Sequence, residues 1–236
     1  MSIEHLNGLA ERLLLTVKTN KNSTSLERDL AAYPSQKLFQ ELQEDNEKKA
    51  FWINIYNSYF LLLRQRGSVK PKIYTSKMIQ IAGISFSLDD IEHGILRRFR
   101  YKYSLGFLPQ LFVGKHIRKL AVKQLDFRLH FALNCGAKSC PPISYYNHEN
   151  IDEQLSIATL SFLDSETTIS EEKKEVTVST LFKWYWADFG KRKGVNHLIK
   201  EALNQDVSAM KLTFAPYNWD EDLSNFNEAS FAASSI

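Results

Sequence analysis

The sequence predicts a mixed α/β domain of the α+β class, in which a central buried helix packs on a small sheet and a helical extension comes first. Three observations support this fold class. Leucines recur at helical spacing in the first 18 residues, residues 47–65 are apolar nearly all round, and a few short runs of β-branched and aromatic residues indicate brief strands. We expect the extension at 1–45, a single domain at 46–225 and a frayed tail at 226–236.

The composition suits a globular chain with a sizeable core. It has 236 residues, of which 44% are hydrophobic and 24% are charged. Two cysteines argue against a disulfide scaffold and suit a reducing compartment. The first 20 residues lack the basic start and apolar core of a signal peptide, and the longest hydrophobic run, 59–63, is too short to cross a bilayer. We therefore expect a soluble cytoplasmic protein without a membrane partner.

Three helices are expected in the N-terminal extension. The first covers residues 3–18, where apolar side chains fall on one face. Ser25 can cap a short second helix, and Pro34 stops it. A third helix then covers residues 35–44.

The central helix is predicted over 47–65, with Gly67 as its C-terminal stop. Within it Asn54, Asn57 and Ser58 lie at i, i+3 and i+4, so they form a narrow polar stripe on an otherwise apolar surface. Buried amides need partners, since each unpaired one costs about 1–3 kcal/mol. Either the stripe ties down loops, or it orients a catalytic histidine and donates to a substrate oxyanion.

The region after the central helix is less regular. Residues 72–74 and 84–86 read as short extended pieces on either side of a glycine. Ser87 can then cap a helix over 88–98.

That helix carries two candidate site residues, Glu92 and His93. Its first turn is acidic, which the positive end of the helix dipole favours. Neighbouring residues point about 100° apart on a helix, so the pair cannot share a metal ion, and the HExxH spacing is absent. We treat His93 as a candidate base and Glu92 as a candidate binding residue.

The most basic part of the chain follows. Aromatic residues at 101, 103 and 107 are interleaved with lysines and arginines, which could bind phosphates or single-stranded nucleic acid. Solvated helix faces explain the same pattern more simply. The formal net charge of only +3 does not demand a nucleic-acid partner, and we do not predict one.

The stretch LHFALNCGAKSCPPI, residues 129–143, gathers the most chemistry-bearing residues. Residues 127–133 read as a buried strand, which would place His130 and Asn134 on one face. The strand would end in a glycine turn that presents Cys135. A histidine on a strand, followed by a thiol on a tight turn, suits a nucleophile–base pair.

The alternative interpretation of this stretch is structural. A buried histidine can be satisfied by a backbone carbonyl, and Cys135 and Cys140 can serve as small hydrophobic residues. Their C-x4-C spacing is at most half of a zinc site, and no second Cys/His pair is close, so we predict no metal. No cofactor motif is present. Asn134, Lys138 and Ser139 are further candidate binding residues.

The C-terminal third alternates helices and strands. A helix is expected at 149–163, a strand at 176–178, an aromatic helix after the cap residue Ser179, and a last strand at 212–215. The tripeptide Asp188-Phe189-Gly190 resembles the metal-binding motif of kinases. No glycine-rich phosphate loop or HRD segment accompanies it, so that function is excluded.

Four blocks, FWINIYNSYF, SLDDIEHGILR, RLHFALNCGAKSCPPI and LFKWYWADFG, occur in an order that resembles the family catalogued as domain of unknown function 547. The resemblance spans residues 50–220 and implies a soluble mixed α/β domain, found alone in bacteria and fused to other modules in plants. It implies no activity. Two positions depart from the family pattern: Phe127 replaces a proline, and Asn218 replaces an aspartate, which weakens an acidic role there. Plant members vary at the position of Cys140, which favours Cys135 as a catalytic thiol.

Two functional hypotheses follow. The first is a thiol-dependent hydrolase or acyl transferase with the site logic of papain-like and transglutaminase-like enzymes. In it Cys135 is the nucleophile, His130 or His93 the base, and Asn54 or Asn57 the orienting or oxyanion group. The second is a non-catalytic binding or scaffold module with a structural polar core. Either would take a small-molecule or peptide ligand.

Overall fold

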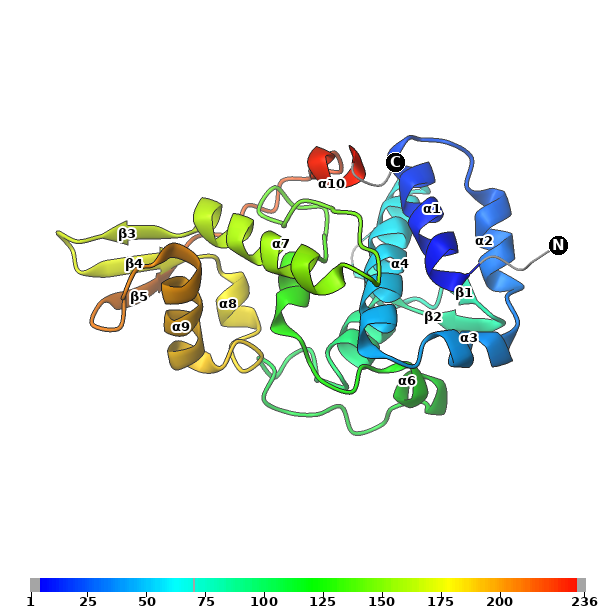
Figure 1. Ribbon diagram of the computed structural model, residues 1–236, viewed down its shortest axis with the longest axis horizontal. Coiled ribbons are helices and arrows are strands. Elements are labelled where there is room, and N and C mark those ends of the chain that lie inside the picture. Colours follow the sequence, from blue (N-terminus) through cyan, green and yellow to red (C-terminus); the bar gives the residue numbers. More distant parts are fainter. Residues whose placement is uncertain (1–4, 70, 233–236) are drawn as a thin grey trace.

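The computed structural model describes residues 5–69 and 71–232. It confirms the predicted mixed α/β class, with a helical N-terminal part and small sheets. Figure 1 shows the first helices gathered around α4 at one end of the molecule and the three-stranded sheet at the other. Among the described residues, no helix is long and apolar enough to span a membrane.

The N-terminal helices match the prediction closely. They are α1 (Leu6–Lys18), α2 (Thr24–Ala31) and α3 (Ser35–Glu41). The start predicted for the first helix, at residue 3, lies outside the described residues. The position before α2 is held by Ser23 rather than Ser25, and the Ser23 hydroxyl donates to Glu27 at 2.8 Å.

The central helix is α4 (Asp45–Gln65), and nearly all of its residues after the first turn are buried. Glu44 and Glu47 form a capping box at its start, and Gly67 follows its end with a φ of +82°. Trp52 packs on Phe86 with ring centroids 5.0 Å apart, so α4 rests on the first small sheet as predicted.

That sheet is the antiparallel hairpin of β1 (Ile79–Ile81) and β2 (Ile84–Phe86). The extended piece predicted at 72–74 is wrong, because α5 (Lys72–Thr75) is a helical turn. Pro71 precedes it with helical backbone angles, and Ile73 is buried. A three-residue stretch has too little periodicity to reveal such a turn from sequence.

The helix predicted at 88–98 is a π-helix, η1 (Asp90–Leu96). The Ser87 hydroxyl and the Asp90 carboxylate cap its start reciprocally, at 2.9 and 3.0 Å. Single π-turns are rare and occur often at functional sites. A long coil then leads to α6 (Lys115–Leu120).

The strand predicted at 127–133 is also wrong. The segment forms a 3-10 helix, η2 (Phe127–Phe131), whose start is capped by the Asp126 side chain on the Arg128 amide at 3.1 Å. A short apolar run between turn residues fits a buried strand and a buried helical turn equally well, and packing decided in favour of the turn.

The C-terminal part forms a second core. Its elements are α7 (Ile151–Glu166), β3 (Thr168–Ser170), β4 (Glu175–Val178), α8 (Leu181–Trp184), α9 (Lys191–Leu203) and β5 (Lys211–Phe214). The sheet has the order β3-β4-β5, with β3–β4 antiparallel and β4–β5 parallel. The helix predicted at 149–163 and the strands predicted at 176–178 and 212–215 are confirmed. The aromatic helix predicted after Ser179, through residue 190, is only the short α8, which Thr180 precedes. Helix α9 and strand β3 were not predicted.

The end of the described chain is more ordered than a frayed tail. Phe231 of helix α10 (Glu228–Ala232) is buried. The Lys18 ammonium lies over its ring in a cation–π contact, 4.3 Å from the ring centroid. Glu228 forms an ion pair with the same lysine at 2.6 Å. Residues 233–236 of the predicted tail lie outside the described residues.

Candidate functional site

A cavity of about 600 Å³ lies where the two cores meet. We call it the central cavity. Aromatic rings form much of its wall: Tyr56, Tyr74, Trp184, Tyr185, Tyr217 and Trp219. Polar side chains from three distant parts of the sequence open into it: Glu92, His93, His130, Cys135 and Cys140. The structure thus brings four of the predicted site residues, with Cys140, to one place.

The predicted amides of α4 do not line this cavity. Asn57 is fully buried; its amide nitrogen donates to the Ala132 carbonyl at 2.9 Å, and its oxygen accepts the Asn134 amide at 3.0 Å. The Asn54 side chain binds the Tyr146 backbone in the same two-fold way, at 2.6 and 3.3 Å. Both amides use their donors and acceptors on main-chain groups.

Asn134 shapes the loop that carries the two thiols. Its side chain accepts the Gly136 amide at 2.6 Å and donates to the Pro141 carbonyl at 2.8 Å, so it spans the loop from one side to the other. Gly136 has a φ of +74°, and a Cβ there would lie 2.8 Å from the Phe60 ring. The close turn at this position therefore requires glycine.

Lys138 and Ser139 attach the C-terminal segment to the same loop. The Ser139 hydroxyl accepts the Asn218 amide at 2.9 Å, and Lys138 forms an exposed ion pair with Asp220 at 3.3 Å. Neither residue is among those that line the central cavity. Together they hold Tyr217 next to the thiols.

The two thiols and Tyr217 form one cluster. Cys140 Sγ accepts the Cys135 amide at 3.1 Å, and the Tyr217 hydroxyl lies 3.2 Å from Cys140 Sγ and 3.6 Å from Cys135 Sγ. Both cysteines are free thiols. The site therefore offers one sulfur, that of Cys140, several hydrogen-bond donors at once.

These donors separate the pKa values of the two thiols. Hydrogen bonds from the Cys135 thiol, the Tyr217 hydroxyl and the Cys135 amide outweigh burial and lower the pKa of Cys140 to about 6. The hydrogen bond to Cys140 and burial raise the pKa of Cys135 above its ordinary value. Burial and the two thiols raise the pKa of Tyr217, which keeps its hydroxyl protonated. These shifts favour ionisation of Cys140 rather than of the predicted Cys135.

A second cluster centres on Asp188, whose side chain is fully buried. One carboxylate oxygen, Oδ2, accepts Arg97 Nε at 2.7 Å and lies 3.0 Å from His130 Nε2. Arg97 is also fully buried and its Nη1 lies 2.8 Å from His93 Nδ1. Burial alone would raise the pKa of Asp188, but His130 and Arg97 outweigh it and hold that pKa below its ordinary value. We call Arg97, His130 and Asp188 the charged cluster.

The charged cluster defines the protonation of both histidines. Burial lowers the pKa of His130 and of His93, with Arg97 acting in the same direction. A carboxylate can only accept a hydrogen bond, so neutral His130 carries its proton on Nε2 and keeps a lone pair on Nδ1. A guanidinium can only donate, so His93 accepts at Nδ1.

Glu92 completes the polar wall. Its carboxylate accepts the Tyr185 hydroxyl at 2.7 Å and the Tyr56 hydroxyl at 3.3 Å. Burial would raise the pKa of Glu92, but the charges of His93 and Arg97 and the hydrogen bond from Tyr185 lower it. The ring of Tyr185 also stacks on His130, with centroids 3.8 Å apart. Tyr185 therefore contacts both the Glu92 carboxylate and the charged cluster.

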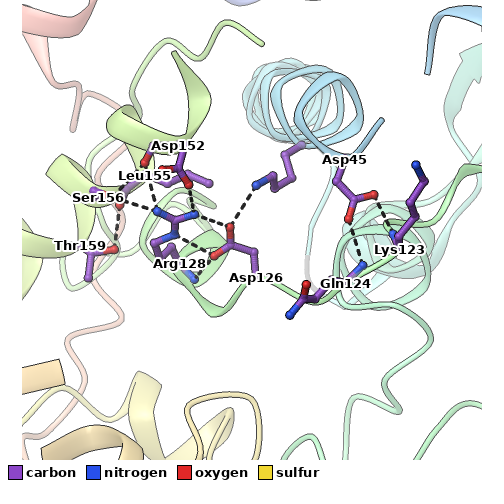
Figure 2. Close-up of polar contacts among 10 residues, drawn as sticks. Asp45, Lys123, Gln124, Asp126, Arg128, Asp152, Leu155, Ser156 and Thr159 are labelled. Atoms are coloured by element: carbon purple, nitrogen blue, oxygen red, sulfur yellow. Dashed lines mark hydrogen bonds and ion pairs between the residues drawn. The ribbon is translucent and has the colours of Figure 1, made fainter. Parts of the chain in front are cut away.

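An ion-pair network outside the cavity holds η2, and hence His130, in place. Figure 2 shows Arg128 between Asp126 and the α7 residues Asp152 and Ser156. Its Nη2 donates to both carboxylates, and its Nη1 donates to the Ser156 hydroxyl. Lys49 of α4 reaches the same Asp126 carboxylate at 3.1 Å. Burial would raise the pKa of Asp126, but Arg128 and Lys49 outweigh it and lower that pKa. The network ties η2 to both α4 and α7.

No hydrogen bond joins either thiol to a histidine anywhere in the described part of the chain. The thiols instead contact Tyr217, which sequence reasoning missed together with Arg97 and Asp188. Weak signals existed: Asp188 is a lone acid in the last of the four family blocks, and Tyr217 directly precedes Asn218, a position that departs from the family pattern. Nothing in either pattern indicated which distant residues they would meet.

The fold and this cavity define a mixed α/β protein with two free thiols and a buried charged cluster around one cavity. The chain belongs to the family described as "Protein of unknown function, DUF547", whose model matches residues 39–163. This match confirms the resemblance found in the sequence. The matched residues include α4, η1 and the loop that carries Cys135 and Cys140, whereas Asp188 and Tyr217 lie outside them. No curated protein and no solved structure matches the chain.

Proposed function

We propose that this protein is a thiol-dependent hydrolase or acyl transferase whose nucleophile is the Cys140 thiolate in the central cavity. The observation that supports this proposal best is the arrangement of donors on Cys140 Sγ, which lowers the pKa of the thiol to about 6. A thiolate, rather than a thiol, is the nucleophile in acyl transfer. At neutral pH the sulfur would be ionised without a histidine to take its proton.

The reaction would proceed through a thioester. Cys140 Sγ forms a bond to the acyl carbon of the substrate, the bond to the leaving group breaks, and Tyr217 or the Cys135 thiol supplies the proton that the leaving group needs. Water, or the hydroxyl or amine of an acceptor, then attacks the thioester. His130 Nδ1 takes the proton of that attacking group, and the Cys140 thiolate is released. That proton then passes from His130 through solvent to Tyr217 or Cys135, whichever gave its proton to the leaving group, so the starting state is restored.

In this proposal His130 acts in the second half of the reaction. Its Nε2–H is held by Asp188, which orients the ring in the way that the third member of a catalytic triad does. His93 is held by Arg97 and Glu92 is held by two tyrosines, so both would shape the substrate end of the cavity. Asn54 and Asn57 would position the loop without contacting the substrate.

A small acyl compound or the acylated side chain of a peptide would fit the central cavity. Its volume of about 600 Å³ is in the range of small-molecule sites, and aromatic walls favour apolar groups. The thiolate must stay reduced to act, so the proposal places the protein in a reducing compartment such as the cytoplasm.

A non-catalytic binding module is the second candidate function. Two observations favour it: neither thiol is hydrogen-bonded to a histidine, and the amides of α4 bind only backbone. In that case the same cavity would hold a ligand without reaction, and the buried charges would specify its shape.

Thiol labelling separates the two candidates. Iodoacetamide labelling of each cysteine is followed by mass spectrometry as pH is varied. We expect Cys140 to label with a midpoint at about pH 6, and Cys135 to label slowly at every pH. Labelling of both thiols only when the protein unfolds would reject the hydrolase and leave the binding module.

A turnover test uses an acyl ester, p-nitrophenyl acetate, as the probe. We expect a burst of one p-nitrophenolate per chain that Cys140→Ser abolishes and that the matched variant Cys135→Ser largely retains. A burst that depends on Cys135 instead would reassign the nucleophile to the residue favoured by the sequence.

A further inference from the structure

The coil between η1 and α6 exposes an unusual amount of apolar surface. Among the described residues, seven of the thirteen exposed large hydrophobic side chains lie within residues 101–112, which we call the apolar loop. Leu111 is 78% exposed and Phe112 is 92% exposed, so both project away from the protein. The segment runs along the lower edge of the molecule in Figure 1. Contiguous exposed apolar residues on a monomer mark an interaction site.

The backbone of the apolar loop is held in place, so this exposure is built into the fold. The Tyr101 amide donates to the Leu108 carbonyl at 2.9 Å, and the Ser104 hydroxyl accepts the Leu108 amide at 3.1 Å. The Leu105 carbonyl accepts the Ala187 amide at 2.9 Å. A Cβ at Gly106 would lie 2.2 Å from Asp188 Oδ1, so only glycine allows the loop to pack this closely on the charged cluster.

The same part of the chain is strongly basic. Residues 93–125 contain eight lysines and arginines and not one aspartate or glutamate. Three of the eight are ion-paired: Arg97 with Asp188, Lys102 with Asp89, and Lys123 with Glu44. The other five form no ion pair within the described residues: Arg98, Arg100, Lys115, Arg118 and Lys119.

We propose that the apolar loop binds the surface of an anionic lipid bilayer, with Leu111 and Phe112 inserted among the lipids and the unpaired cations on the headgroups. Apolar side chains that project singly suit insertion into lipid, whereas a partner helix would need a groove to receive it. The cations that precede and follow the apolar loop in the sequence complement the negative surface of the bilayer. Tyr103 and Lys102 of the same region line the central cavity, so bilayer binding would bring its opening close to the lipid.

This inference does not rest on the proposed thiol chemistry. It also differs from the sequence-based expectation of no membrane partner. That expectation rested on a small net charge and on the lack of a spanning segment, and peripheral binding needs neither a large net charge nor a spanning segment.

Vesicle sedimentation tests the proposal with the whole chain. The probes are phosphatidylcholine vesicles with about 30 mol% phosphatidylserine and vesicles of phosphatidylcholine alone. We expect the wild type to bind the anionic vesicles roughly tenfold or more tightly than the neutral ones, and to lose this preference as salt is raised. Equal binding to both vesicles, or binding to neither, would overturn the proposal.

Two variants identify the surface. Leu111→Ser with Phe112→Ser should weaken binding to anionic vesicles by roughly tenfold or more. The matched control is Ile157→Ser with Leu160→Ser on α7, where the side chains are 53% and 47% exposed, and it should bind as the wild type does. Both pairs are on the surface, so an unchanged thermal transition shows that each variant is folded. Equal loss in both pairs would overturn the assignment to the loop.

Charge variants complete the test. Lys115→Gln and Arg118→Gln should each weaken binding by roughly fivefold, whereas the exposed α9 residues Lys193→Gln and Lys200→Gln should have no effect. Tight binding of the wild type to a single-stranded oligonucleotide, with no binding to anionic vesicles, would overturn the proposal in favour of nucleic-acid recognition.

Discussion

The molecule buries two sets of polar side chains, and they are satisfied in different ways. On α4, Asn54 and Asn57 use both ends of their amides on main-chain groups of distant loops. In the charged cluster, Asp188 accepts Arg97 and His130 on one oxygen, while its other oxygen and Arg97 Nη2 are buried without a hydrogen-bond partner in the described structure.

This difference distinguishes buried polar residues that stabilise the fold from buried polar residues that serve a function. A fully paired neutral amide stabilises one arrangement of the chain and has no unused bonding capacity for a ligand. Charges that are buried with unmet bonding capacity are costly, and such groups cluster at functional sites. The α4 amides therefore belong to the fold, whereas the charged cluster supports the central cavity through His130, which lines it.

The largest effect is expected for Asp188→Ala. It leaves Arg97 as an uncompensated buried charge, which should lower the free energy of unfolding by about 3–5 kcal/mol. Urea denaturation measures this change. The matched control is Asp152→Ala, an acid with a 75% exposed side chain that binds Arg128, and it should cost less than about 1 kcal/mol. Similar small losses in both variants would show that Asp188 does not compensate a buried charge on Arg97.

Next in size is Asn57→Ala on α4. It leaves the Ala132 carbonyl and the Asn134 amide unpaired, at about 1–3 kcal/mol for each group. Urea denaturation again gives the value, and the thiol labelling midpoint should stay close to that of the wild type. Asn150→Ala is the control, because Asn150 is exposed and makes no side-chain cap. A variant that keeps its stability but loses labelling at Cys140 would reverse the assignment of this amide.

Tyr217→Phe should have a smaller effect. Removal of the hydroxyl that lies 3.2 Å from Cys140 Sγ should raise the labelling midpoint of Cys140 by roughly one pH unit or less. Iodoacetamide labelling measures it directly. Tyr74→Phe is the control, since this ring lines the same cavity and its hydroxyl reaches only the Cys135 carbonyl, at 3.5 Å. An unchanged midpoint in Tyr217→Phe would remove this residue from the thiolate site.

The smallest effect is expected for the change in the free energy of unfolding with pH. Burial holds the folded pKa values of His93 and His130 below the ordinary value of 6.5, so the unfolded chain takes up these protons first. The stability that depends on these two histidines is therefore complete above about pH 6.5, and it falls as the pH drops through that value toward the folded pKa values. Urea denaturation at a series of pH values measures it.

His130→Gln should flatten this acid-side decline, whereas His197→Gln, at an exposed position on α9, should leave it as in the wild type. Asp188 and Glu92 have lowered folded pKa values, so they add a further loss of stability only in more acidic solution. A decline that is identical in the wild type and His130→Gln would show that this histidine is not held neutral.

Much of the fold followed from local pattern. The all-round apolarity of α4 and the helical spacing of α1 were sufficient, because a long periodic segment can bury its apolar side chains in few other ways. The same approach gave the wrong structure for the turn at 72–75 and for the segment 127–131, which were predicted to be extended and are helical. In a run of four or five residues periodicity is ambiguous, and the capping by Asp126 and the ion pairs of Arg128 selected the 3-10 turn.

The candidate site was predicted in part. Cys135, His130, His93 and Glu92 do line one cavity, and the dense stretch 129–143 pointed to it. The choice between the two thiols could not be made from sequence, since it depends on Tyr217, which is 77 residues from Cys140 along the chain. The dismissed motif at 188–190 contributes the aspartate that holds His130, through a contact 58 residues apart.

By itself, the sequence determined the fold class, the family and the stretch that carries the thiols, because these depend on residues close together in the chain. Only the tertiary structure decided that Cys140 receives the hydrogen bonds, that Asp188 binds Arg97 and His130, and that Leu111 and Phe112 project from the surface. The physical reason is that the pKa of a group and its exposure depend on what surrounds it. Those surroundings come from segments that only packing brings together.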